Sequence, residues 1–232
     1  MGTDLTPVVI SIKVALTSTI IVTVIATGLA WIMSGCRFPG QTLLETLAGL
    51  PMVLPPTVTG FGLLLLFGKN GPLGYILEST LHVRVVFTWW AAVIAAAVVS
   101  FPLMYRSAKA AMDTVDANLQ HAARTLGASE WRVLITVTLP LAWPGFVAGI
   151  LLAFARALGE FGATLMVAGN IPGQTQTIPL AIFFAVESGD MRSAGFLVTV
   201  ISLLSFIITY GLNAWSGQKG RTRAKAGGAY NA

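Results

Sequence analysis

The sequence predicts an all-α membrane protein with about five transmembrane helices, and three observations support this. Only 10% of the 232 residues are Asp, Glu, Lys or Arg, whereas an ordinary soluble domain carries about 25%. Apolar residues make up 55% of the chain and the mean hydropathy is +0.79, which is more apolar side chain than a soluble chain of this length can bury. The charged residues also leave long uncharged runs between them.

Six uncharged runs are long enough to be considered as membrane spans. They cover residues 14–36, 46–68, 85–105, 133–155, 161–186 and 193–218. A helix needs about 20 mostly apolar residues to cross about 30 Å of hydrocarbon, and five of the runs supply them. The run 161–186 does not, because turn-forming residues at 169–177 would leave backbone groups unsatisfied in lipid.

The basic residues predict the orientation of the chain. Five crossings with the basic tail in the cytoplasm put the amino terminus outside, and nine of the 14 Lys and Arg residues then lie on the inner side, as the positive-inside rule requires. These nine are Arg37, Arg106, Lys109, Arg124, Arg132, Lys219, Arg221, Arg223 and Lys225. We expect a membrane domain over residues 1–218 and a disordered basic tail over 219–232. A sixth crossing would move that tail outside.

Several kinds of site are excluded by composition. The single cysteine, Cys36, cannot close an intramolecular disulfide, and the two histidines, His82 and His121, form no metal-ligand cluster. The basic residues form no continuous stripe of the kind that binds nucleic acid. No Gly-x-x-x-x-Gly-Lys-[Ser/Thr] motif occurs, so the chain lacks the phosphate-binding loop that ATP hydrolysis uses. We therefore expect no catalytic residue, no metal and no cofactor in this chain, which lies in membrane lipid.

Three prolines interrupt the second run. Pro51, Pro55 and Pro56 remove backbone donors and must kink or break a helix there. A broken helix is stable in a membrane only where protein or a water-lined cavity receives it. We interpret the break as a functional bend in a translocation pathway or gate.

The longest charged segment lies between the third and fourth predicted spans and has a helical pattern. Asp116 is a candidate N-cap and Gly127 a candidate C-cap. Ser129 can cap a second helix that leads into the fourth span. The apolar stripe of the first helix is narrow and rich in alanine, so that another protein's backbone can come close; a helix resting on lipid headgroups would show the same pattern. The stripe consists of Leu119, Ala122, Ala123 and Leu126.

The same segment resembles a known family motif. His121-Ala122-Ala123, then Gly127, then Val137-Thr138-Leu139-Pro140 resembles the EAA loop of permease subunits of ABC importers, with His121 in place of Glu and Val137 in place of Ile. The resemblance implies a type I ABC importer permease fold, with a coupling loop over 106–139 that docks on a cytoplasmic ATPase, where ATP and Mg are bound. The implied coupling residues are Leu119, His121, Ala122, Ala123, Leu126, Gly127, Leu139 and Pro140.

Further segments narrow the resemblance. Residues 154–164 (FARALGEFGAT), 169–173 (GNIPG) and 50–56 (LPMVLPP) are similar to the molybdate permeases of the ModB type, which are relatives of the sulfate permeases. The resemblance implies import of molybdate, and of tungstate, through the bacterial inner membrane, with a periplasmic molybdate-binding protein and an ATPase dimer as partners. Five helices form a thin bundle, so we expect a homodimer. A sulfate or thiosulfate permease is an alternative, and a non-transporting membrane scaffold is another.

Two ionisable residues lie near the outer end of the fourth predicted span. Arg156 and Glu160 are neighbours on one face if that helix continues through both, and ionisable residues at membrane depth usually mark a pathway. A local salt bridge at the membrane boundary is an equal alternative. Phe161 and Gly162 follow directly and are candidates for a constriction, although ordinary packing would also place a phenylalanine there.

Overall fold

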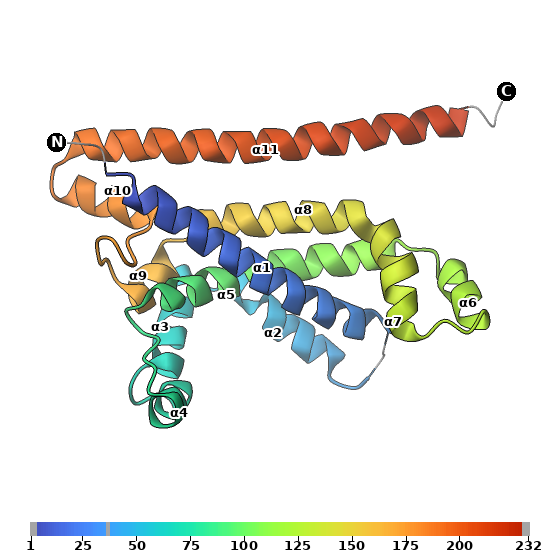
Figure 1. The fold of residues 1–232 in the computed structure, drawn as a ribbon, viewed down its shortest axis with the longest axis horizontal. Helices are drawn as coiled ribbons and strands as arrows, with labels where there is room; N and C mark the ends of the chain where they lie inside the picture. The colour runs from blue at the N-terminus through green and yellow to red at the C-terminus, as the bar shows by residue number, and fades with distance from the viewer. Residues whose placement is uncertain (1–3, 36–37, 229–232) are drawn as a thin grey trace.

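The computed structural model describes residues 4–35 and 38–228, with side chains as far as residue 211. Within these ranges every regular element is helical (Figure 1). In chain order the helices are α1 (Thr6–Gly35), α2 (Gln41–Val53), α3 (Pro56–Phe67), α4 (Pro72–Leu81), α5 (Trp89–Asp113), α6 (Ala117–Thr125), α7 (Glu130–Val133), the π-helical turn η1 (Leu134–Thr138), α8 (Leu139–Leu158), α9 (Gly162–Ala168), α10 (Ile178–Glu187) and α11 (Met191–Gly228).

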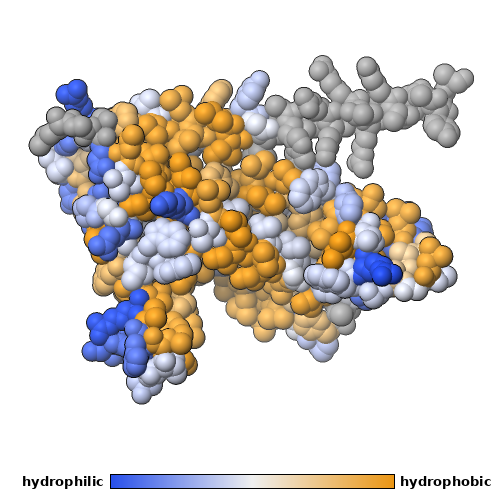
Figure 2. All heavy atoms as spheres, in the orientation of Figure 1, coloured by the Kyte–Doolittle hydropathy of each residue, from blue (hydrophilic) through white to orange (hydrophobic). Residues whose placement is uncertain are grey.

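The two ends of the bundle carry different helices. The end that carries α6 and α7 is called the inner end here, because the distribution of basic residues puts it in the cytoplasm. The opposite, outer end carries α4, α10 and the start of α1 (Figure 1). Figure 2 shows apolar residues over the middle of the bundle and hydrophilic residues gathered toward its ends, which is the distribution expected of a protein that crosses a membrane.

The core consists of α1, α5 and α8, which pack most extensively on one another. Small residues allow this close packing. A Cβ added at Gly149 of α8 would lie 2.7 Å from Ser107 Cβ of α5, and one at Gly145 would lie 2.5 Å from Ala111 Cβ. Without a hydrophobic driving force between helices in lipid, such close contact supplies much of the attraction.

The predicted number of crossings agrees with the structure. Among the described residues, four helices are long and apolar enough to cross a membrane, or five if the pair α2 and α3 counts as one crossing. Residues 161–186, which we expected not to span, form the short helices α9 and α10 with a loop between them. That prediction is confirmed.

The proline-rich break is larger than a kink. The axes of α2 and α3 differ by 116°, so the second predicted span is not a straight helix. Leu54 has extended backbone angles (φ −69°, ψ 142°), which the proline that follows it favours over helical ones. Pro55 is extended too, and Pro56 begins α3. The chain therefore leaves the direction of α2 before α3 starts.

The redirected helix α3 packs tightly on α9 through Gly60. A Cβ at this position would lie 2.8 Å from Ala163 Cα, which is backbone and cannot move aside. We therefore expect Gly60→Val to destabilise the protein by about 1–3 kcal/mol, measured as a lower thermal unfolding midpoint in detergent. Gly62→Val is the matched control, since no atom lies within 4 Å of a Cβ there. Equal loss in both variants would contradict this packing.

The fourth span is one continuous helix with an irregular turn. Residues Glu130–Leu158 run without a break, but Leu134–Thr138 is π-helical. Pro140 lies at the start of α8 and has no N–H to donate to the carbonyl of Thr136. A missing donor of this kind favours a widened turn. The inner part of the helix, α7, thereby takes a direction different from that of α8 (Figure 1).

The last helix extends past the boundary we expected. The backbone of α11 is helical as far as Gly228, so the helix continues past residue 218, where we expected the membrane domain to end. Lys, Arg and Ala are good helix formers, and propagation of an existing helix needs no new nucleus. Residues 229–232 lie outside the described part of the chain.

Candidate functional site

The predicted coupling helix is present as α6, with both predicted caps. The Asp116 carboxylate accepts a hydrogen bond from the backbone N–H of Asn118 at 2.8 Å. At the other end Gly127 has φ +83°, and the N–H groups of Gly127 and Ala128 donate to the carbonyls of Arg124 and Ala123. This is the Schellman arrangement, which needs a residue that tolerates a left-handed conformation. The helix bounds predicted from the sequence are confirmed.

The outward face of α6 is narrower than the predicted stripe. No residue of α6 is buried, and Leu119 and Leu126 are 50% and 89% exposed. Ala122 is exposed with them, but Ala123 is half-buried and faces the rest of the chain. The exposed apolar face therefore consists of Leu119, Ala122 and Leu126.

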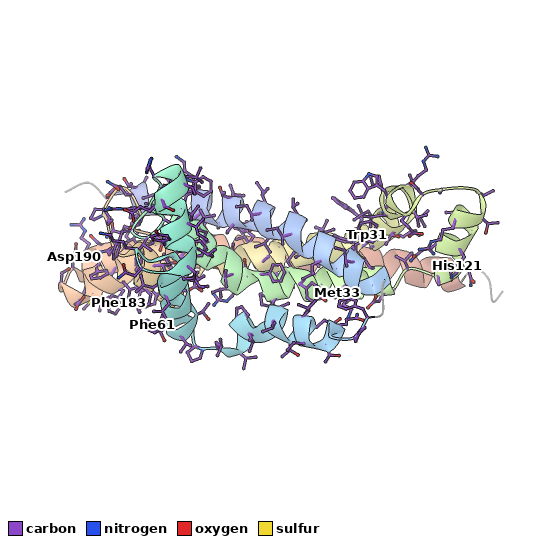
Figure 3. The ribbon with its side chains drawn as sticks, turned by 90° about the horizontal axis from the view of Figure 1, so that it is seen from below. Trp31, Met33, Phe61, His121, Phe183 and Asp190 are labelled. Atoms are coloured by element: carbon purple, nitrogen blue, oxygen red, sulfur yellow. The ribbon has the colours of Figure 1, made fainter. Side chains whose placement is uncertain are left out.

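Behind α6 lies a cavity of about 290 Å³. It opens between α6, the end of α1 and the helix α7, and His121 lies at its edge together with Trp31 and Arg124. Figure 3 shows His121 at the inner end, far from Phe61 and Asp190 at the outer end. His121 is itself exposed. An exposed side chain at this place is accessible to a partner, and the docking role of His121 stays a prediction.

An ion pair connects α6 to α7. The Arg124 guanidinium donates through Nε to Glu130 at 2.7 Å and through a second nitrogen at 3.0 Å. The hydrogen bond that the Arg124 guanidinium donates to Glu130 raises the pKa of Arg124, so this cation stays charged. The Ser129 hydroxyl accepts from the N–H of Arg132 at 3.4 Å, which confirms the predicted second cap. Force applied to α6 can thus pass into α7 and the fourth span.

Loss of the ion pair between Arg124 and Glu130 is expected to lower transport much more than it lowers the stability of the fold. Arg124→Gln is expected to change the unfolding midpoint little, because exposed ion pairs contribute about 0–1 kcal/mol. The same variant is expected to lower ATP-driven uptake several-fold, since α6 is then free to tilt against α7. Arg132→Gln, a nearby neutralisation without an ion pair among the described residues, is the control. Normal uptake by Arg124→Gln would contradict the coupling role of the pair.

The remaining coupling residues lie where α8 begins. Leu139 packs against the buried cluster that includes Met33 and Met112, and Pro140 is exposed in the first turn of α8. Trp31 of α1 meets Trp131 of α7 edge to face, with ring centroids 6.0 Å apart. These contacts anchor the inner end of the fourth span to the bundle rather than to a docking surface.

At the outer end, Arg156 and Glu160 form the expected pair, although the helix we expected to carry both ends at Leu158. Arg156 lies 2.8 Å from the Glu160 carboxylate, and their side chains are 33% and 2% exposed. The other carboxylate oxygen accepts from the N–H of Ala163 at 2.8 Å, at the start of α9. Glu160 therefore both pairs with Arg156 and caps the next helix.

The residues after Glu160 contact the proline break. A Cβ at Gly162 would lie 2.9 Å from Pro56 Cβ, so the start of α9 lies against the start of α3. The Phe161 ring packs on Phe183 of α10 at a centroid distance of 5.3 Å. The structure thus brings Pro56 and Gly162 together, with the Arg156–Glu160 pair nearby. Pro51 lies within α2, before the break.

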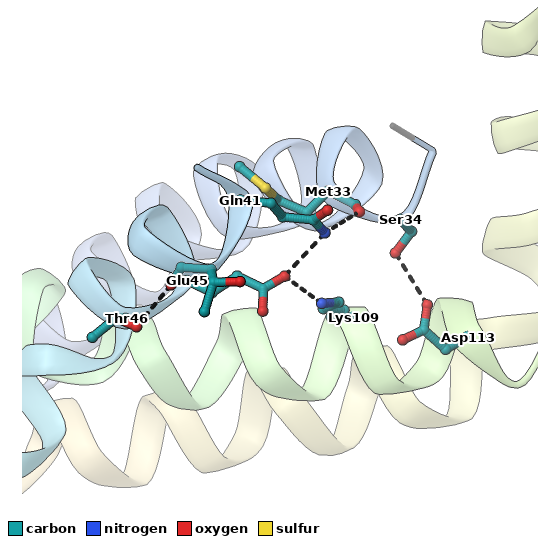
Figure 4. A network of polar contacts seen from close by, with 8 residues as sticks. Met33, Ser34, Gln41, Glu45, Thr46, Lys109 and Asp113 are labelled. Carbon is teal, nitrogen blue, oxygen red and sulfur yellow. Dashed lines mark hydrogen bonds and ion pairs between the residues drawn. The ribbon is translucent and has the colours of Figure 1, made fainter. Parts of the chain in front are cut away.

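A second polar cluster was not predicted from the sequence. Lys109 of α5 pairs with Glu45 of α2, and Glu45 also accepts from the Gln41 amide at 3.2 Å (Figure 4). The same amide donates to the carbonyl of Met33 at 2.9 Å, which joins α2 to the end of α1. Glu45 and Lys109 are 64 residues apart, and no local pattern connects them.

These features define a class of protein. The chain is a multi-pass helical membrane protein with a rigidly capped, exposed helix at the inner end and a broken span within it, as expected of the membrane-spanning part of a transport system. The chain belongs to the family of binding-protein-dependent transport system inner membrane components, whose family model matches residues 26–221. It is a transport subunit of the bacterial inner membrane and not a catalytic one.

Relatives of known name extend over most of the chain. A Bacillus subtilis protein provisionally named as a molybdenum transport system permease is 50% identical, over 88% of this chain and 90% of its own length. The molybdenum transport system permease protein ModB of Escherichia coli K12 is 45% identical, over 84% of this chain and 85% of its own. The sulfate transport system permease protein CysT of the same organism is 37% identical, over 83% of this chain and 69% of its own.

Solved structures agree on the fold. A chain of an alginate ABC transporter, in complex with its pentasaccharide-bound periplasmic protein, matches with a TM-score of 0.73 at 14% identity, over 93% of this chain and 79% of that one. A chain of the methionine ABC transporter MetNI in an inward-facing conformation matches with a TM-score of 0.66 at 15% identity, over 90% and 92%. The expected type I ABC importer permease fold is confirmed.

Proposed function

We propose that this chain is the permease subunit through which an ATP-driven importer moves molybdate into the cytoplasm. The observation that carries the proposal is that relatives named as molybdenum transport permeases are 50% and 45% identical over 90% and 85% of their own length, whereas the relative named as a sulfate permease is 37% identical over 69% of its own. Tungstate has the same shape and charge as molybdate and is expected to follow the same path.

In the proposed mechanism, the inner end of the bundle binds the ATPase and the outer end forms the gate. Two copies of the chain would enclose a pathway along a two-fold axis, because one thin bundle does not surround a path by itself. Two ATPase subunits, each with its ATP and Mg, would receive the faces of α6 formed by Leu119, Ala122 and Leu126. Closure of the ATPase pair would draw the two α6 helices together.

The motion would reach the outer half through the continuous helix Glu130–Leu158. This helix ends beside Glu160 and α9, and α9 packs on α3 after the break. Displacement of α8 would therefore move the contact between Gly162 and Pro56. In this proposal the contact between Gly162 and Pro56 forms the outer part of the gate, together with Arg156, Glu160 and Phe161. A periplasmic binding protein would deliver the anion there.

The proposal is tested by uptake into proteoliposomes. The permease, its ATPase and its binding protein are reconstituted together, and radiolabelled molybdate and sulfate are compared. We expect ATP-dependent uptake of molybdate that excess tungstate suppresses and equal sulfate does not. Preference for sulfate would replace the molybdate assignment with the sulfate one, and absence of any ATP-dependent uptake would favour a membrane scaffold.

A further inference from the structure

A polar cavity of about 350 Å³ lies on the inner half of the bundle, between α2 and the last turns of α5. Its lining residues are Glu45, Tyr105, Arg106, Lys109, Ala110 and Asp113. Arg106, Lys109 and Asp113 lie in the last two turns of α5, at the inner boundary of the membrane, and ionisable residues that border a membrane-spanning bundle often mark a route for ions or polar substrates. The cavity shares no lining residue with the outer Arg156–Glu160 pair or with α6.

Two cations face this cavity from the same side of α5. Arg106 and Lys109 are three residues apart and are therefore neighbours on the helix surface. Lys109 pairs with Glu45, whereas Arg106 makes no ion pair within the part of the chain that the structure describes. Gly49 of α2 leaves room for its guanidinium, since a Cβ there would lie 3.3 Å from it.

A buried hydroxyl also lines the cavity. Tyr105 is 4% exposed, and its ring stacks on Phe101 at a centroid distance of 6.1 Å. Its hydroxyl makes no hydrogen bond of ordinary geometry among the described residues, and the carboxylate that lies near it, Glu45, already pairs with Lys109. A buried donor without a partner is costly, and such groups are rare in native proteins. An anion in the cavity would supply the missing acceptor.

We propose that Arg106, Lys109 and the Tyr105 hydroxyl form a low-affinity site for a tetrahedral divalent oxyanion on the inner half of the translocation pathway. The inference rests on the function proposed above, because it names the route of the same substrate class. The location fits such a route. Glu45 lies six residues before Pro51 in α2, the half of the broken span that extends toward the inner end (Figure 1).

Glu45 has a specific part in this site. With the cavity empty, it holds Lys109; when a dianion arrives, Lys109 and Arg106 contact the anion together. Glu45 then competes for Lys109 and favours release, and Asp113 at the inner side of the cavity repels the anion further. A pathway site must bind weakly enough for its ion to leave, and a carboxylate that competes for the cation supplies this.

The test measures the reactivity of Lys109 in the purified complex of the permease with its ATPase. An amine-modifying reagent is added with and without molybdate, and modification of each lysine is followed by mass spectrometry. We expect molybdate to slow the modification of Lys109 and not that of Lys69, which lies in the α3–α4 turn. Arg106→Gln is expected to abolish this protection, whereas Tyr105→Phe weakens it.

A matched pair of variants isolates the competing carboxylate. Glu45→Gln is expected to raise the reactivity of Lys109 in the empty complex, to strengthen protection by molybdate, and to lower the maximal rate of uptake several-fold because release becomes slower. Glu78→Gln removes the carboxylate of the exposed Glu78–Arg84 pair and is expected to change none of these.

The outcomes separate this inference from the function on which it rests. If the complex imports molybdate, but molybdate slows the modification of Lys109 neither in the unaltered complex nor in the Glu45→Gln variant, the inner site is disproved and the proposed function stands. If the complex imports only sulfate and sulfate protects Lys109, the inner site is supported while the molybdate assignment fails.

Discussion

Replacing Leu126 by aspartate is expected to abolish ATP-driven uptake while the permease itself stays folded. Leu126 is 89% exposed, so the free chain loses almost no packing. In the proposed complex the same side chain would be buried against the ATPase, where a leucine contributes about 1.5–3 kcal/mol and an unpaired carboxylate is strongly unfavourable. Binding of the ATPase should therefore weaken at least about tenfold.

Co-purification of the ATPase with tagged permease measures this effect, with uptake as a second readout. Leu126→Met, which keeps an apolar side chain of similar volume, is expected to retain both. The unfolding midpoint of the isolated permease should be the same for all three proteins. Undiminished co-purification with Leu126→Asp would show that the exposed face of α6 does not dock on the ATPase.

The second large effect is a loss of stability when the outer ion pair of Arg156 and Glu160 is broken, and the loss depends on which of the two residues is replaced. Arg156→Gln would leave the Glu160 carboxylate, whose side chain is 2% exposed, buried without its cation. Breaking a buried pair in this way costs about 3–5 kcal/mol, and the lower end applies because Arg156 is partly exposed. Glu160→Gln would leave a cation that can turn toward solvent and an amide oxygen that can still cap α9, so its cost should be about 1 kcal/mol.

Unfolding midpoints of the two single variants and the double variant in detergent test this order. The double variant Arg156→Gln/Glu160→Gln should recover much of the loss caused by Arg156→Gln alone, because the stranded charge is gone. If Glu160→Gln proves the more destabilising of the two, stranding of the carboxylate is not the main cost, and the carboxylate acts chiefly as the cap of α9.

Local features of this fold could be predicted because their causes are local. The caps of α6 depend on residues within three or four positions of the helix ends, and Asp116 and Gly127 identify both. The break near Pro55 follows from two prolines that cannot donate and from the restriction they place on Leu54. The direction of α3 after the break could not be predicted, because it depends on the contact of Gly60 with Ala163.

Features that depend on distant contacts were missed. In the sequence, Glu45 is only the charge before the run 46–68 and Lys109 only one of the inner basic residues, and nothing in their surroundings indicates that α2 lies beside α5. The inward position of Ala123 was missed for a related reason: periodicity identifies a stripe, but the contact of α6 with α7, set by Arg124 and Glu130, decides which edge of the stripe is covered.

The widened turn at Leu134–Thr138 has a consequence for how force moves through the fourth span. Such a turn holds one more residue than the regular helix on either side, and that surplus can shift along the chain while most backbone hydrogen bonds persist. Each residue transferred rotates the segments on its two sides by about 100° relative to each other. A push on the cytoplasmic side can therefore arrive in the membrane as a twist.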